Sequence, residues 1–113
     1  MARTEQDARI WAGDHADLQF TVVDSTGTAV NITGATISWK CAASVDATSA
    51  IFTKTTVSGI TITNGAAGIF KVSILPADTT TLSGVLYHEA QMTLSGAVTT
   101  VALGKLTIEK TLH

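Results

Sequence analysis

The stretch LYHEAQM (residues 86–92) places a phenol, an imidazole and a carboxylate side by side. Enzymes use these groups for proton transfer when they face the same substrate. Alternate positions of the stretch are apolar, which is typical of a half-buried β-strand, so we expect His88 on the inner face and Tyr87 and Glu89 on the outer face. His88 and Glu89 then cannot act as an acid–base pair. We predict that His88 is structural, partly buried and hydrogen-bonded near a sheet edge.

Asp14, His15 and Asp17 form a second group with possible chemistry, because together they offer three ligands to a metal ion. They follow Gly13 at the start of a predicted strand, however, and the oxygen-rich pattern of a calcium loop is absent. The histidines of the chain are far apart in the sequence and form no zinc motif. We therefore expect neither a metal nor another cofactor.

Motifs for nucleophilic catalysis are also missing from the sequence. It contains no G-x-S-x-G, no phosphate-binding glycine loop and no Cys–His signature. The single cysteine, Cys41, falls on the inner face of a predicted strand and is expected to be a small core residue. Asp46 and Asp78 are expected to be solvated loop acids. No catalytic residue is assigned, and we predict that the chain is not an enzyme.

The composition indicates one domain with a weakly charged surface. A chain of 113 residues is long enough for a single core. The net charge is −2 and the Lys and Arg residues are scattered, so nucleic-acid binding is not expected. The sequence has neither a membrane-spanning apolar run nor a secretory signal, so we expect the chain to stay where it is made. Only 14% of the residues are charged, against about 25% in ordinary soluble domains. This low charge favours association with other proteins.

Period-two alternation of apolar and polar residues predicts a chain of short strands. The predicted strands are residues 18–23, 30–32, 35–41, 51–56, 60–63, 69–75, 85–94 and 98–108. Turn residues separate several of them, at Asp24–Gly27, in a hairpin loop at Asn64–Gly68 and at Ser95–Gly96. Pro76 is expected to open one helical turn. Gly104 marks an expected bulge, because the apolar phase slips there.

Short strands without a long helix favour an all-β fold, an immunoglobulin-like β-sandwich of about seven to eight strands, with a small barrel as the alternative. We expect the sandwich to span residues 13–113 and to follow a short flexible N-terminal arm, residues 1–12. The predicted core between the two sheets consists of Leu18, Phe20, Ile37, Trp39, Phe70, Val72, Ile74, Met92 and Ile108.

Three stretches resemble a pattern from tailed bacteriophages. They are AGDHADLQFTVVDSTGTAVNITGATISWKC, GITITNGAAGIFKVSILPADTTTLSGVLYHEAQMT and TVALGKLTIEK. The first combines a Gly-Asp lead-in, an alternating strand, an Asp-x-x-Gly turn and a Thr-Gly-Ala-Thr step. The others add a Thr-Ile-Thr hairpin, an Ala-Asp-Thr bridge and Tyr-His-Glu in the penultimate strand. The chain is thus similar to the immunoglobulin-like domain of phage baseplate upper proteins and of small stand-alone virion proteins.

The resemblance implies a structural protein of the virion, made in the host cytoplasm, that contacts its own copies and other virion proteins. A tail or baseplate adaptor, a fibre-attachment adaptor and a capsid decoration protein all fit this description. The chain ends at His113 without a receptor-binding part, which favours a small accessory protein. The family pattern carries no catalytic residues. The alternative function is a glycan-binding module of adhesin type, although aromatic residues are only 5% of the chain.

The N-terminal arm is the segment expected to make assembly contacts. Met1–Ile10 shows no strand-like alternation, so it is predicted to have little to pack on in a monomer. We expect the arm to lie across a neighbouring subunit, with Trp11 as its anchor. The alternatives are a disordered leader and, for Trp11, packing on the sheet edge or holding a sugar ring. The predicted assembly contacts are Arg3, Arg9, Ile10 and Trp11.

Overall fold

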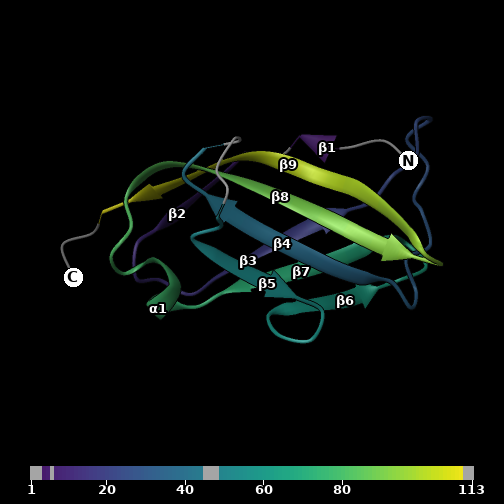
Figure 1. Cartoon of the computed structure of the whole chain (residues 1–113), viewed down its shortest axis with the longest axis horizontal. Coiled ribbons are helices and arrows are strands. Elements are labelled where there is room, and N and C mark those ends of the chain that lie inside the picture. The colour runs from purple at the N-terminus through teal and green to yellow at the C-terminus, as the bar shows by residue number, and fades with distance from the viewer. Residues whose placement is uncertain (1–3, 6, 45–48, 111–113) are drawn as a thin grey trace.

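A computed structural model describes the backbone of residues 4–5, 7–44 and 49–110 and the side chains of 7–44 and 49–110 (Figure 1). The described residues form nine strands in two sheets and one short helix. The large sheet contains β1 (Thr4–Glu5), β2 (Ala8–Trp11), β4 (Thr36–Ala42), β5 (Phe52–Thr55), β8 (Gly84–Leu94) and β9 (Ala97–Glu109). The small sheet contains β3 (Ala16–Thr21), β6 (Ile60–Asn64) and β7 (Ile69–Ile74). The prediction of an all-β sandwich is confirmed.

The strand order explains how the chain closes its core. The large sheet runs β1-β9-β8-β4-β5, with β2 also on β9, and the small sheet runs β3-β7-β6. The chain crosses between the sheets after β2, β3, β5 and β7, so each sheet holds strands that are distant in sequence (Figure 1). The helix α1 (Pro76–Thr79) makes the last crossing. It is a single turn, and in the described part of the chain no helix is long and apolar enough to cross a membrane.

The core lies where the alternating strands of the two sheets face each other. Along β4 the buried positions are Ile37, Trp39 and Cys41, and the residues between them are more exposed. The same alternation runs along β7 and β8. Of the predicted core, only Leu18 is not fully buried, and it packs against the core from a half-buried position. The strand phases read from the sequence are therefore confirmed.

Three rings join the sheets at the centre of the core. Phe20 comes from β3, Trp39 from β4 and His88 from β8. The ring of His88 lies with its centroid 5.7 Å from those of both Phe20 and Trp39. Phe20 also stacks on Phe70 of β7, with centroids 5.2 Å apart. Such aromatic contacts add to the free energy of simple burial, so this cluster fixes the relative position of the two sheets.

The N-terminal arm differs most from its prediction. β2 pairs in parallel with β9, with Ile10 opposite Ile108, and Ile10 is only 7% exposed. β1 pairs with the same strand at Ala102–Leu103. The expectation that Met1–Ile10 has little to pack on is therefore wrong for Ala8–Ile10, which belongs to the sandwich. The predicted boundary at residue 12 does not separate these residues from the large sheet.

Several local predictions are confirmed. The Asp24 carboxylate accepts hydrogen bonds from the Thr26 hydroxyl and from the N–H groups of Thr26 and Thr28, which closes the predicted turn. These bonds hold the pKa of Asp24 below its usual value. The predicted hairpin joins β6 to β7. Ser95 and Gly96 join β8 to β9 with φ of 52° and 84°, as a two-residue hairpin turn requires.

Two local predictions are wrong. Residues 30–32 form no strand: Ile32 is buried, but its N–H donates to Gly65 O within a loop. The bulge lies at Val101 instead of Gly104, because Ala90 pairs with Ala102 and the next residue of β8 pairs with Thr100. Val101 and Ala102 are consequently both buried, and this produces the phase slip seen in the sequence.

Candidate functional site

The stretch LYHEAQM is part of β8, and its side chains alternate as predicted. His88 is buried inside the sandwich, whereas Glu89 is exposed on the opposite face. The indole N–H of Trp39 donates to His88 Nδ1 at 3.2 Å, so in the neutral ring the proton sits on Nε2. β8 lies between β4 and β9, so His88 is in the middle of the large sheet. The prediction that it lies near a sheet edge is therefore wrong.

The outer face of the large sheet presents mainly short polar side chains. β4 contributes Thr36, Ser38 and Lys40, and Lys40 lies opposite Glu89 of β8. The Thr100 hydroxyl of β9 donates to Glu89 at 3.2 Å. This face also carries Arg9, Lys105 and Glu109, so its charges are of both signs and no strong field of one sign opposes the approach of another protein.

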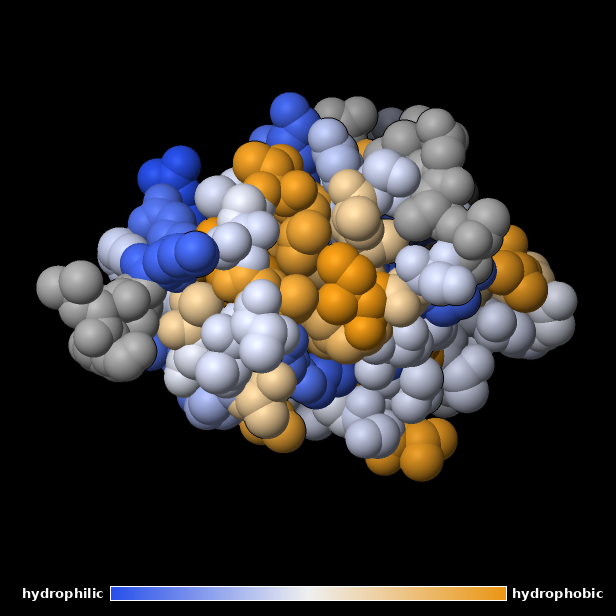
Figure 2. Space-filling view, turned by 60° about the vertical axis from the view of Figure 1, so that its left-hand side comes forward, coloured by the Kyte–Doolittle hydropathy of each residue, from blue (hydrophilic) through white to orange (hydrophobic). Residues whose placement is uncertain are grey.

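At the end of the sheet near α1, the outer face becomes apolar. Val85 and Tyr87 of β8 point outward on either side of the buried Leu86, and Val85 is 52% exposed. Ala42 of β4 lies opposite Tyr87. Ile51 is exposed beside the end of β4, where its N–H bonds Cys41 O. Figure 2 turns this end of the molecule forward and shows apolar side chains gathered at its centre.

The predicted assembly residues divide between the two faces of β2. Arg9 and Trp11 point outward: Arg9 Nε lies 3.1 Å from Glu109 Oε1, and Trp11 is 51% exposed. Ile10 points inward into the core, so its side chain is not offered to a partner. Arg3 lies outside the described residues. We use the name outer patch for the exposed or half-buried residues Trp11, Ala42, Ile51, Val85 and Tyr87.

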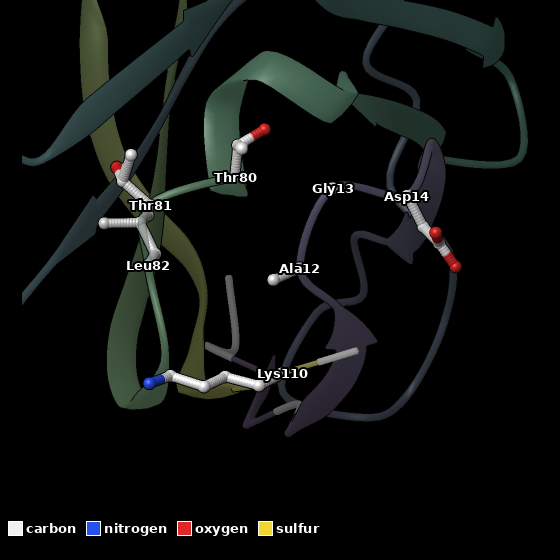
Figure 3. A pocket seen from close by; sticks show the side chains of 7 residues that line it. All are labelled: Ala12, Gly13, Asp14, Thr80, Thr81, Leu82 and Lys110. Carbon is white, nitrogen blue, oxygen red and sulfur yellow. The ribbon is translucent and has the colours of Figure 1, made fainter. Parts of the chain in front are cut away.

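A polar cleft lies just beyond the ends of β2 and β9, where α1 leads into β8 (Figure 3). It has a volume of about 530 Å³ and is lined by Ala12, Gly13, Asp14, Thr80, Thr81, Leu82 and Lys110. The Gly13 N–H donates to the hydroxyl of the buried Thr79. The Asp14 carboxylate points away from the middle of the cleft (Figure 3). In a specific ligand site a few polar groups converge on one point, and the polar groups of this cleft do not.

The three candidate metal ligands near the start of β3 do not form one group, although His15 and Asp17 lie close to each other. Asp17 Oδ1 accepts a hydrogen bond from the Ser73 hydroxyl, and His15 Nε2 lies 3.6 Å from the same oxygen. Lys71 Nζ lies 3.8 Å from the other oxygen of Asp17. Among residues 7–44 and 49–110, no three His, Cys, Asp or Glu side chains are grouped so that they could hold a metal ion.

Two remaining reactive groups have structural surroundings. Cys41 is fully buried, and burial raises the pKa of its thiol to about 11, so it is a poor nucleophile at neutral pH. The prediction that Asp78 is a solvated loop acid is wrong. Its carboxylate accepts the Leu75 N–H and lies 2.6 Å from Lys54 Nζ. Asp46 lies outside the described residues.

The Lys54–Asp78 ion pair is a feature that the sequence did not reveal. Lys54 lies opposite Trp39 in the β4–β5 pairing and so points to the inner side of the large sheet. Its side chain is 11% exposed and that of Asp78 is 20% exposed. The pair ties β5 to α1. A Lys at an inward position of a predicted strand would have indicated a buried partner. The sequence of residues 51–56 does not show which of its residues face inward, so this signal could not be used.

Comparison with known proteins gives no relative: no protein-family model matches the chain, and no curated protein matches it. The function proposed for the chain therefore rests on the sequence resemblance and on the surface described above.

Proposed function

We propose that this chain is a structural protein of a bacteriophage virion that acts through contacts with its own copies and with other virion proteins. The observation that carries the proposal is the outer patch. Val85 and Trp11 are each about half exposed on a sheet face that otherwise carries Thr, Ser and Gln together with charged residues of both signs. Exposed apolar groups gathered within a weakly charged face are typical of protein–protein contact sites.

The packing around Trp39 and the pairing of the last strand support the immunoglobulin-like part of the proposal. In immunoglobulin domains, a buried Trp of the third strand packs against a disulfide that joins the two sheets. Here Trp39 of β4 packs against His88, which in turn contacts Phe20 of the other sheet. The Phe20–His88 contact takes the place of a disulfide as the link between sheets. The last strand also pairs in parallel with an N-terminal strand.

The first test is the location of the chain. Phage particles from the source of the sequence are purified on a density gradient and analysed by mass spectrometry. The proposal expects the chain in the particle fraction at a fixed ratio to the major structural proteins. Its presence in the lysate and absence from purified particles would contradict the proposal.

The second test addresses the outer patch. An epitope-tagged chain is supplied during infection, and the tag is measured in purified particles. Val85→Lys places a charge in the patch and is expected to reduce incorporation at least tenfold. Val98→Lys is the matched control, because Val98 is also exposed on the same sheet, at 64% against 52% for Val85, but lies opposite Thr93 at the far end of β8. Equal incorporation of both variants would show that the patch is not the contact.

Glycan binding is the second candidate function, and the exposed Trp11 favours it. An indole half open to solvent offers a surface on which a sugar ring can stack, and the polar cleft begins at the next residue, Ala12. A glycan array with the purified chain tests this alternative. Specific binding that Trp11→Ala abolishes would favour the glycan-binding module over a purely structural role.

A further inference from the structure

One edge of the small sheet is open over its whole length. β3 pairs with β7 on one side, and no other described strand pairs with it. The Val22 N–H donates to Gly68 O, which continues the β3–β7 ladder by one residue. Because bonded positions alternate in an antiparallel ladder, the backbone groups of Leu18 and Phe20 also face β7. The N–H and C=O groups of Asp17, Gln19 and Thr21 therefore face away from the sheet.

The other sheet edges in the described residues are shortened, irregular or used. β6 is interrupted by a register shift between Ile62 and Asn64. At the edge of β5, the N–H and C=O of Thr55 are both bonded to Ser58. β2 is only four residues long and carries the charged Arg9. These devices limit pairing with another chain.

The edge of β3 lacks such protection. Its sequence, ADLQFT, contains no Pro or Lys, and its pairing with β7 shows no bulge. Its one charge, Asp17, is turned back over the sheet. The carboxylate bonds the Ser73 hydroxyl and lies near Lys71, both on β7. The carboxylate therefore does not block the free backbone groups of β3, and a second strand can approach them.

We propose that two copies of this chain associate by antiparallel pairing of their β3 strands about a two-fold axis at Gln19. In this register Gln19 lies opposite the partner's Gln19, and Asp17 lies opposite the partner's Thr21. All three outward-facing residues then pair, which gives about six backbone hydrogen bonds. No like charges are opposed. Half-buried Leu18 faces the partner's Phe20 on the inner side, and the two small sheets become one continuous sheet.

This inference deepens the proposed assembly role by naming one partner, a second copy, and the strand that binds it. It is tested with the purified chain alone, so its outcome is separate from the location test. A monomeric chain that is present in particles overturns the edge pairing only. A β3-paired dimer that is absent from particles overturns the virion role only.

The first experiment is a disulfide cross-link. Cys41 is the single cysteine and is buried, so an introduced surface cysteine is the one exposed thiol. Bonded antiparallel pairs have Cα atoms about 5.5 Å apart, within the range of a disulfide. Gln19→Cys is expected to form a covalent dimer under mild oxidation. Thr61→Cys, exposed on β6 at the other edge of the same sheet, is the control and is expected to stay monomeric.

The second experiment uses charge. Analytical ultracentrifugation is expected to show a dimer for the parent chain. Gln19→Lys and Gln19→Glu each oppose like charges across the axis and are expected to weaken dimerisation at least tenfold. An equimolar mixture of the two is expected to regain it as a heterodimer. A monomeric parent chain at millimolar concentration overturns the proposal, as does a dimer that neither variant weakens or a cross-link formed equally well at Thr61→Cys.

Discussion

The inner and outer faces of the large sheet are built from the same strands but differ in what a substitution can do. On the inner face of β4, Trp39 and Cys41 are fully buried. One residue away on the outer face, Ser38 and Lys40 meet solvent or neighbouring short polar side chains. The inner face therefore determines stability, and the outer face is free to determine association.

The informative residues are those that do not follow this division. Lys54 is a charged residue directed inward, and its charge is matched by Asp78. Val85 is an apolar residue directed outward, and about half of its surface is exposed to solvent. A buried charge requires a partner within the chain, whereas an exposed apolar side chain gains free energy from a partner outside it. The two exceptions thus indicate, respectively, an internal tie and an external contact.

The largest expected effect is at the centre of the inner face. Trp39→Ala is expected to lower the free energy of unfolding by about 3–5 kcal/mol, because it removes a large buried ring and leaves a cavity. Ser38→Ala, the neighbouring change on the outer face, is expected to alter it by less than about 0.5 kcal/mol. Urea denaturation followed by circular dichroism measures both. Similar values for the two variants would show that the faces do not differ in this way.

His88 tests whether the polar contact within the core contributes beyond packing. His88→Leu leaves the indole N–H of Trp39 without its acceptor and is expected to cost about 1–3 kcal/mol. His88→Gln keeps an acceptor and is expected to cost less. Denaturation of the two variants provides the measurement. The opposite order would mean that the ring contacts of His88 matter and its hydrogen bond does not.

Cys41 tests the inner face through pH. Burial raises the pKa of its thiol from 9.0 to about 11, so the thiol ionises in the unfolded chain at a lower pH than in the folded chain. Its contribution to stability is therefore complete below pH 9 and is lost as the pH rises from 9 toward 11. Cys41→Ala is expected to lose less stability over this interval. Unfolding curves of both proteins at pH 8, 9.5 and 11 give the comparison.

The Lys54–Asp78 pair is expected to have a smaller effect. A double-mutant cycle with Lys54→Met and Asp78→Asn is expected to give a coupling energy of about 1 kcal/mol, because the pair is largely but not fully shielded from water. The cycle also distinguishes an internal tie from a fortuitous contact. A coupling energy near zero in low salt would assign the burial of Lys54 to its aliphatic stem alone.

Val85 is expected to show the smallest change in stability. Val85→Lys is predicted to shift the unfolding free energy by less than about 0.5 kcal/mol, because the side chain already meets solvent. The same variant is expected to lose incorporation into particles. A large loss of stability would place Val85 among the residues that hold the fold and would remove it from the contact surface.

The alternation along each strand made most of the sandwich predictable from the sequence. The phases of Trp39, His88 and Phe70 were read correctly, because a period of two assigns each residue to a face without knowledge of its neighbours. These successes are local, and so is the signal behind them.

The features that were missed depend on pairing between distant segments. Ala8–Trp11 is too short to show a convincing alternation, and its partner Leu106–Glu109 lies at the other end of the chain. Ile10 was consequently placed in an exposed contact when it lies in the core. The Lys54–Asp78 pair likewise joins a strand to a helix across a crossing of the chain. The free edge of β3 could be found only once the partner of every other strand was known.

The parallel pairing of β2 with β9 gives the domain a direction of mechanical strength. The two strands run the same way, with Ala8 opposite Leu106 and Trp11 opposite Glu109, so β2 begins at one end of their paired segment and β9 finishes at the other end. Tension applied between these ends slides β2 along β9 and loads their backbone bonds together, in shear, instead of opening them one at a time. A subunit held at both ends would resist extension along its long axis far better than peeling from the side.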